Sequence, residues 1–233
     1  MKDILIWSDY ACPYCYIGEK RLMDAIDQLH LREEFNILYK AFELNPDAPR
    51  KTDETIPELL AKKYHMTLEQ AKERVAEIDR AGNESGLVFR YGTAPSSNTL
   101  DAHRLMKFAE EKYGMEVAET LNRLLFEAYF TDNRRLADHD VLMQLAVNAG
   151  MPTEETSRVL NSERYIKQVR QDEDEAHRLN VRGVPFIVFD RRIAVPGAIS
   201  VDDFKKVLED VIKDAPEEER LAGNTCTESG CSI

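Results

Sequence analysis

The 233-residue chain contains little cysteine, and its four cysteines form two close pairs at opposite ends. Four cysteines are too few to hold together a disulfide-rich scaffold, and a chain of this length can bury a sizeable hydrophobic core without such links. Cysteines that occur in close pairs favour redox or metal chemistry instead.

The sequence also lacks any apolar run near the ~20 residues that a membrane-spanning helix needs. Its N-terminus enters a short apolar segment directly, without a long apolar stretch and cleavage site, so we expect a cytoplasmic location. Basic residues are outnumbered, because 31 Lys and Arg against 43 Asp and Glu leave a formal net charge of −12. This charge repels nucleic acids and anionic membranes, so we expect neither as a partner.

What the chain does contain is a Cys-Pro-Tyr-Cys motif between a predicted strand and a predicted helix. Residues 3–8 form a short run of large apolar residues, and residues 22–29 carry apolar side chains at helical spacing. Cys12 then lies at a helix N-terminus, where free N–H groups and the helix dipole favour a thiolate. Thiols in that setting titrate at about 3.5–7.5, against about 8.5 for free cysteine. Cys15 follows one turn later, in a more shielded position. We therefore assign Cys12 as the attacking nucleophile and Cys15 as the resolving thiol.

Half of a structural zinc site is the alternative interpretation of this motif. Zinc needs two further ligands nearby, and the histidines show no metal-ligand spacing with one another. We therefore expect no metal, and a Cys-x-x-Cys motif near a βαβ-like pattern points to thioredoxin-type redox chemistry.

The remaining pattern predicts a βαβ unit, a helical block and an αββα unit. A second strand is predicted over residues 35–42, and residues 55–160 are largely helical. Another helix is predicted over residues 162–180, and its acidic run at 171–175 is expected to face solvent. Two strands joined by a tight turn and a last helix follow, predicted over 186–189, 193–195 and 200–213. The two ends of the chain together predict a four-stranded mixed sheet covered by helices.

Several motifs carry a resemblance to a known family. They are Trp7-Ser8-Asp9-Tyr10 before the cysteines, Asn98–Arg104 in the helical block, and Gly183-Val184-Pro185-Phe186 with Pro196-Gly197-Ala198 near the end. With these motifs the chain resembles the DsbA family of thioredoxin-fold proteins, and within it the FrnE-like branch found in the cytoplasm. The resemblance implies a thioredoxin fold with a large all-helical insertion. Residues 1–45 and 162–214 would form the thioredoxin-like domain, 46–161 the insertion, and 215–233 a flexible tail.

The resemblance also implies roles for residues around the cysteines. Val184-Pro185 matches the family's cis-proline loop, which faces the catalytic disulfide and offers backbone groups to an extended substrate. Pro13 and Tyr14 would tune the redox potential and belong with Val184 and Pro185 to the substrate-binding region. An equally supported interpretation of Tyr14 is a packed aromatic residue without such a role. The implied activity is thiol–disulfide exchange or isomerisation on protein or small-molecule disulfides. It needs no cofactor beyond the redox-active disulfide, which could exchange with glutathione or thioredoxin.

Three sets of residues, Asp9, His103 and the tail cysteine pair, have more than one interpretation. We interpret Asp9 as a turn-stabilising aspartate rather than a proton acceptor for Cys15, and His103 as a packing residue. The tail pair, Cys226 and Cys231, is predicted to act as an auxiliary redox pair that exchanges with Cys12 and Cys15. Its alternative is two exposed thiols in a mobile end.

Two other functions remain open. One is the glutathione-dependent branch of the same fold, the kappa-class transferases and chromene-carboxylate isomerases, which typically keep serine where Cys12 stands. Cys15 is the feature that argues against it. The other is a redox-gated chaperone or zinc-binding module whose helical block binds exposed apolar segments.

Overall fold

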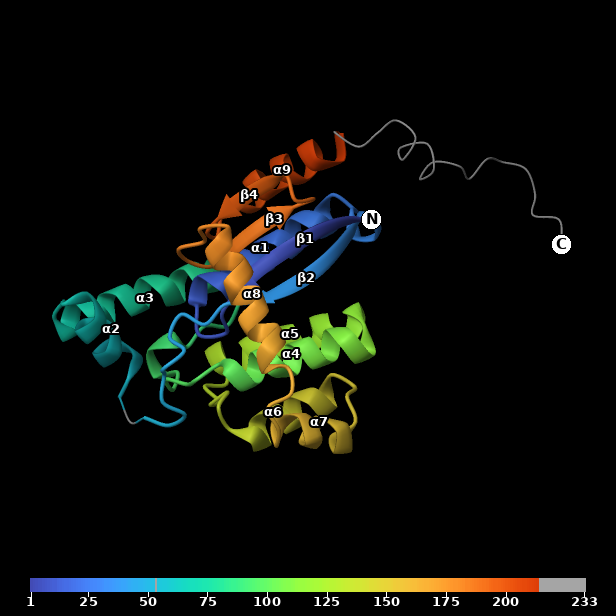
Figure 1. Ribbon diagram of the computed structural model, residues 1–233. Helices are drawn as coiled ribbons and strands as arrows, with labels where there is room; N and C mark the ends of the chain where they lie inside the picture. The colour runs from blue at the N-terminus through green and yellow to red at the C-terminus, as the bar shows by residue number, and fades with distance from the viewer. Residues whose placement is uncertain (53, 214–233) are drawn as a thin grey trace, which may run out of the picture.

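The computed structural model describes residues 1–52 and 54–213 (Figure 1). Cys226 and Cys231 lie outside the described residues. The four strands of the described chain are β1 (Lys2–Ser8), β2 (Phe35–Ala41), β3 (Phe186–Phe189) and β4 (Ile193–Pro196). They form one sheet in the order β2-β1-β3-β4, in which β1 and β2 are parallel and the other neighbours are antiparallel. The chain has a thioredoxin fold, as predicted.

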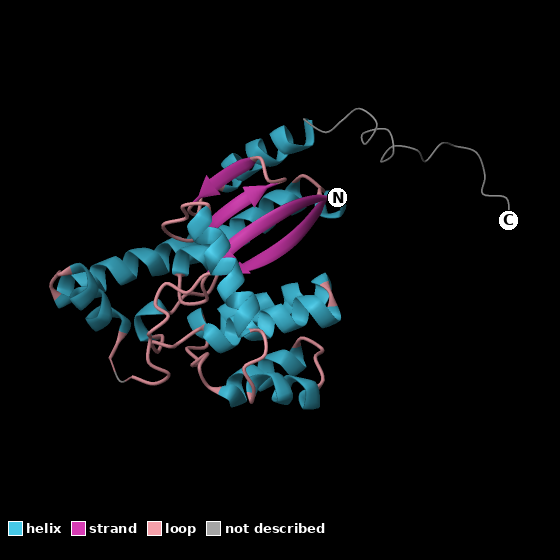
Figure 2. Cartoon of the chain, viewed as in Figure 1, coloured by secondary structure: helices cyan, strands magenta, loops and turns pink. Residues whose placement is uncertain are grey.

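Helices cover both faces of the sheet (Figure 2). The first, α1 (Pro13–Gln28), packs beside α9 (Val201–Lys213), and α8 (Ile166–Arg178) crosses the opposite face. On that opposite face Leu5 and Trp7 of β1 form a small core with Ala176 of α8. The sheet is therefore buried on both sides where β1 runs, which agrees with the continuous apolar run of that strand.

The helical block lies between β2 and α8 in the chain. Its helices are α2 (Ile56–Tyr64), α3 (Leu68–Glu84), α4 (Leu100–Tyr113), α5 (Met115–Phe130), α6 (His139–Asn148) and α7 (Thr153–Leu160). Two short 3₁₀ turns, Arg32–Glu34 and Tyr91–Thr93, complete the helical elements of the described chain. Capping boxes at Thr55 and Thr67 start α2 and α3. The block is thus a substantial all-helical insertion.

One helix of the insertion docks on the edge strand of the sheet. The amide of Tyr39 in β2 donates to Glu110 Oε1 of α4 at 2.9 Å, and Lys107 of α4 donates to the Tyr39 carbonyl. Side chains of α4 thereby satisfy backbone groups that an exposed sheet edge would leave unpaired. This docking brings α4 to the part of the sheet that precedes the cysteines.

The structure differs from the predicted pattern in α8. The helix begins at Ile166, not near residue 162, because Tyr165 adopts a left-handed backbone conformation with φ 69°. The prediction that the acidic run faces solvent is wrong for Asp172, which is buried. Its carboxylate accepts from the Ala41 amide at 3.1 Å and pairs with Lys40 at 3.0 Å and Lys107 at 2.8 Å. Asp172 therefore fastens α8 to β2 and α4.

Candidate active site

The two cysteines lie where β1 passes into α1. The Cys12 amide donates to the Asp9 carbonyl at 3.0 Å. This hydrogen bond closes a turn that connects the strand to the helix. Cys12 is the N-cap of α1, with an extended backbone, and Pro13 occupies the first helical position, where its fixed φ suits the helix and its missing N–H costs nothing. The Cys12 side chain makes no capping hydrogen bond, so its sulfur is left for other contacts at the positive end of the helix.

Both sulfurs are free thiols and both are largely covered. Cys12 is 5% exposed and Cys15, one helical turn later, is 2% exposed. Of the two residues between them, Pro13 is buried and Tyr14 is 37% exposed. Tyr14 is therefore the part of the motif that offers surface to a partner, and Pro13 offers little.

The Val184–Pro185 loop lies against Cys12. Sheet register pairs Trp7 with Phe186, so the residues before β3 reach the same end of the sheet as the residues after β1. The Val184–Pro185 peptide bond is cis, and the Cys12 thiol donates to the Val184 carbonyl with Sγ and O 3.5 Å apart. The structure thus brings Cys12, Cys15, Val184 and Pro185 together.

Gly18 of α1 allows this close approach. A Cβ added at Gly18 would lie 3.1 Å from Pro185 Cγ and 3.2 Å from Ala198 Cβ. Only a residue without a side chain fits at that distance without moving its neighbours.

Burial gives Cys15 a pKa well above its ordinary value, and the adjoining Cys12 raises the pKa further. The Asp9 backbone and the Ser8 side chain act in the opposite direction and lower the pKa in part. Cys15 therefore holds its proton at neutral pH, which fits a thiol that acts second.

Asp9 is buried beneath the cysteines. Its carboxylate accepts from the amides of Ala11 at 3.1 Å and Leu44 at 2.7 Å, which makes it the turn-stabilising residue that the sequence predicted. Burial acts to raise the pKa of Asp9, but His103 and the two amides outweigh it and hold the pKa below its usual value. His103 Nε2 lies 3.6 Å from Asp9 Oδ1.

Two features of this site were not predicted from the sequence. Ser8 was noted only as part of a motif, and nothing indicated that His103 of α4 lies beside Asp9. No short-range pattern links residues so far apart, although both belong to the motifs that carry the family resemblance.

Within residues 1–52 and 54–213 no three His, Cys, Asp or Glu side chains gather as a metal site would require. No helix in those ranges is both long and apolar enough to cross a membrane.

A thioredoxin fold with a dithiol at the start of its first helix defines the class of thioredoxin-fold oxidoreductases. The chain belongs to the family described as the DSBA-like thioredoxin domain, whose model matches residues 3–209. Membership of this family assigns the protein to the redox enzymes.

Three known proteins illustrate what the chain is similar to. The structure of a probable DsbA oxidoreductase, SCO1869 from Streptomyces coelicolor, is 31% identical, with a TM-score of 0.86 over 100% of this chain and 99% of that one. The uncharacterized protein YwbO of Bacillus subtilis is 24% identical over 89% of this chain and 96% of its own length. The cytosolic disulfide reductase DsbM of Pseudomonas aeruginosa is 16% identical, with a TM-score of 0.61 over 91% of this chain and 100% of that one. At 16% identity, the similarity to DsbM shows a shared fold and nothing about function.

Proposed function

We propose that the protein is a cytoplasmic thiol–disulfide oxidoreductase or isomerase of the FrnE-like branch, acting on protein or small-molecule disulfides. The observation that carries the proposal is the pair of free thiols at the β1–α1 junction, with the Val184 carbonyl 3.5 Å from Cys12 Sγ. A dithiol needs a nucleophile at a helix N-terminus and a shielded partner one turn away, and Cys12 and Cys15 have those positions.

The proposed reaction proceeds in two exchanges. The Cys12 thiolate attacks a substrate disulfide, forms a mixed disulfide and releases one substrate sulfur as a thiolate. Cys15 then attacks the Cys12 sulfur, forms the Cys12–Cys15 disulfide and releases the second substrate thiol. Two electrons pass to the substrate, and glutathione or thioredoxin would restore the dithiol. If the substrate's own thiol attacks before Cys15 does, the disulfide is rearranged and no electrons are transferred.

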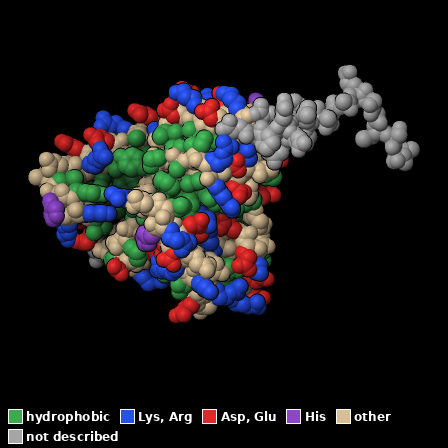
Figure 3. Space-filling view, turned by 45° about the horizontal axis from the view of Figure 1, so that its top comes forward, with side chains coloured by type: hydrophobic (Ala, Val, Ile, Leu, Met, Phe, Trp, Pro, Cys, Tyr) green, Lys and Arg blue, Asp and Glu red, His purple; other side chains and the backbone are tan. Residues whose placement is uncertain are grey.

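Substrate binding is assigned to the surface around Cys12. Tyr14 is exposed beside it, Val184 lies across from it, and the Val184 carbonyl is already within contact distance of the nucleophile. Figure 3 shows hydrophobic side chains gathered on the face between the α2–α3 end of the molecule and the sheet. An extended chain could pair with backbone groups of the Val184–Pro185 loop while apolar side chains lie on this surface.

A cytoplasmic setting is part of the proposal. It is supported by the net charge of −12, which disfavours an anionic membrane surface, and by the fold shared with a disulfide reductase described as cytosolic. Fractionation of cells that express the full chain, followed by immunodetection, tests this setting.

The glutathione-dependent isomerase or transferase remains the second enzyme candidate, because it shares the fold. Cys15 argues against it, since a second thiol behind the nucleophile resolves a mixed disulfide and has no use in an isomerase that only binds glutathione.

The proposed activity is tested by insulin reduction with dithiothreitol as the electron source. We expect the full chain to accelerate precipitation of the insulin B chain and Cys12→Ser to abolish the acceleration. An equal rate with Cys12→Ser would contradict the proposal.

Cys226 and Cys231 are proposed to exchange disulfides with the active-site pair. Replacing both by serine should change the rate at which glutathione disulfide oxidises Cys12 and Cys15, and leave thermal unfolding unchanged. An identical oxidation rate across a range of pH would show that the pair has no such role.

A further inference from the structure

A cleft lies between α1 and α5, where the insertion meets the thioredoxin-like domain. Its volume is about 300 Å³, the lower end of the range of about 300–1,000 Å³ that small-molecule sites occupy. Neither active-site cysteine lines it, so the cleft is distinct from the dithiol site. Its walls include Tyr16, Glu19 and Met23 on one face of α1, Glu119 and Arg123 on α5, and Tyr39 on β2.

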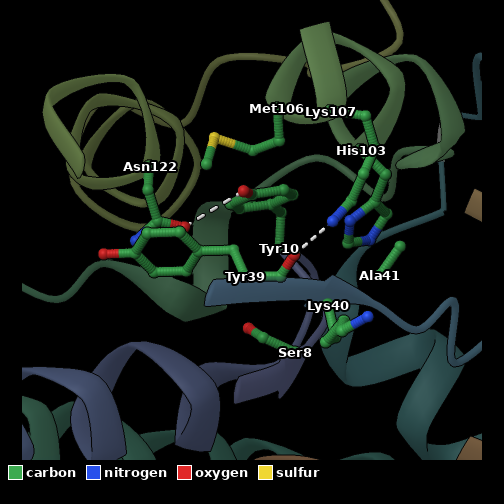
Figure 4. Close-up of a pocket in the computed structure, with 9 residues that line it drawn as sticks. All are labelled: Ser8, Tyr10, Tyr39, Lys40, Ala41, His103, Met106, Lys107 and Asn122. Atoms are coloured by element: carbon green, nitrogen blue, oxygen red, sulfur yellow. Dashed lines mark hydrogen bonds between the residues drawn. The ribbon is translucent and has the colours of Figure 1, made fainter. Parts of the chain in front are cut away.

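The Glu19 carboxyl in this cleft has one oxygen without a partner. Asn122 accepts from the Tyr10 hydroxyl through its oxygen, as Figure 4 shows, and donates to Glu19 Oε1 through its nitrogen. Glu19 Oε2 is buried and has no hydrogen-bond partner among the described residues. Because the terminal torsion of a glutamate side chain is soft, a modest rotation can present Oε2 to a molecule in the cleft.

The two cations that line the cleft are already paired within their own helices. Lys20 pairs with Asp24 at 2.5 Å, and Arg123 pairs with Glu127 at 2.9 Å. In the part of the chain that the structure describes, no lysine, arginine or histidine pairs with Glu19. Its carboxylate therefore has no counter-ion of its own.

The remaining ionisable groups around this carboxyl do not supply a positive charge either. Glu119 faces it from α5 and is itself paired with Arg32 of the 3₁₀ turn at residues 32–34. Burial raises the pKa of Tyr10 and Tyr39 well above the ordinary value and the pKa of Tyr16 to about 12, so all three phenols are neutral. Burial and the charge of Glu119 together raise the pKa of the Glu19 carboxyl to about 7.

We infer that this cleft binds a small organic ammonium ion, whose charged group pairs with the Glu19 carboxylate and whose apolar body packs against Tyr16 and Met23. An ammonium group supplies both the positive charge and the N–H donors that the carboxylate lacks. The net charge of −12 also draws cations toward the protein. The inference does not involve the thiols, so it would stand even if the proposed function failed.

Three probes with the same aryl-ethyl body test the head group that the cleft selects. They are phenethylammonium, the neutral phenylethanol and the anionic phenylpropionate, each titrated calorimetrically into the reduced full chain at about pH 8. We expect the ammonium ion to bind at least about tenfold more tightly than the other two, since a charge-assisted hydrogen bond to a buried carboxylate distinguishes it.

The pH dependence of binding identifies the carboxyl group. A carboxyl group with a pKa of about 7 is about one-tenth ionised at pH 6 and about nine-tenths ionised at pH 8, whereas an alkylammonium keeps its proton throughout. The affinity for phenethylammonium should therefore rise about tenfold over this range. At about pH 7 binding should release about half a proton from Glu19 to the buffer, which titrations in buffers of different ionisation enthalpy measure.

Two variants locate the site. Glu19→Gln keeps the size of the side chain and removes the charge, so it should weaken binding at about pH 8 by about tenfold or more and abolish the proton release. Thr120→Trp places a large ring on the α5 wall of the cleft and should obstruct binding without touching the carboxyl group. Glu73→Gln, at an exposed position of α3, is the matched control and should bind like the parent chain.

Several results would overturn the inference. Equal binding of phenethylammonium and phenylethanol would show that the cleft recognises only the apolar body, and tighter binding of phenylpropionate would make Lys20 and Arg123 the recognition groups. Unchanged affinity in folded Glu19→Gln, or an equal loss in Glu73→Gln, would remove Glu19 from the site. Absence of binding at millimolar phenethylammonium would also contradict the inference.

Discussion

Two thiols one helical turn apart differ in their surroundings. Cys12 is the N-cap of α1, at the positive end of the helix dipole, while Cys15 lies one turn further along the helix and is buried. Because burial raises the pKa of Cys15, its thiolate is scarce at neutral pH and increases as pH rises. The order of the two exchanges follows from this difference.

Alkylation across pH tests that order. With Cys226 and Cys231 replaced by serine, iodoacetamide should label Cys12 first and label Cys15 only at distinctly higher pH, as peptide mapping of the alkylated chain would show. Labelling of Cys15 at the same or lower pH would contradict the assignment.

Glu19 is a second residue whose environment has a measurable consequence. It lies in α1, accepts from the Asn122 amide through one oxygen, and has no hydrogen-bond partner for buried Oε2 among the described residues. Burial, with a smaller contribution from the charge of Glu119, raises its pKa from the ordinary 4.5 to about 7, although the Asn122 bond acts in the opposite direction. The folded protein therefore holds a proton here that the unfolded chain releases above about pH 4.5.

Because of Glu19, the free energy of unfolding should fall as pH rises from about 4.5 to about 7. Glu19→Gln removes the ionisable group, so we expect it to stabilise the protein by on the order of 1–3 kcal/mol at about pH 8 and not at about pH 4. Urea unfolding at the two pH values measures the difference. Glu73→Gln, at an exposed position within α3, is the control and should change the free energy of unfolding little at either pH value. Equal effects of Glu19→Gln at both pH values would count against the raised pKa.

Between elements, the position of Pro185 depends on how closely α1 approaches the loop before β3. Alanine at Gly18 would gain up to about 1 kcal/mol in helix propensity. Its Cβ, however, would lie 3.1 Å from the Pro185 ring and 3.3 Å from the Ala198 backbone, neither of which is the end of a flexible side chain. Overpacking of this kind costs about 1–3 kcal/mol, so the contact outweighs the propensity.

We therefore expect Gly18→Ala to lower the melting temperature and to slow insulin reduction, because the Val184 carbonyl is displaced from Cys12. Gly183→Ala provides a control in the same loop, since nothing lies within 4 Å of a Cβ there. A Gly18→Ala variant as stable and active as the parent chain would refute this view of the packing.

The elements of the sheet were predictable because their signals are local. The apolar run of β1, the cysteine spacing, the turn before β4 and the Ser200 cap of α9 each lie within a few residues of chain. The start of α8 was missed because the left-handed conformation of Tyr165 is not encoded by a glycine or asparagine.

Contacts between distant segments were not predictable in the same way. Asp172 stands in an acidic run that resembles a solvated helix face, yet it caps the edge of β2 and pairs with two lysines. His103 and Asp9 meet only because α4 docks on β2. Periodicity reports which face of an element is apolar, but not which charged group of another element will pair with it.

At the scale of the whole molecule, the β1–α1 junction supplies the dithiol, and the insertion packs against the β2 edge of the sheet. The central claim is that this assembly exchanges disulfides through Cys12 and resolves them through Cys15. Trapping the covalent intermediate tests the claim most directly, by intact-mass measurement of the chain with both tail cysteines replaced by serine.

After incubation of the reduced protein with glutathione disulfide, Cys15→Ser should accumulate one glutathione adduct that peptide mapping places on Cys12. The chain with both active-site cysteines should pass on to the Cys12–Cys15 disulfide, and Cys12→Ser should carry no adduct. An adduct on Cys15 of the Cys12→Ser variant at a comparable rate, or no adduct on Cys12 in Cys15→Ser, would contradict the account.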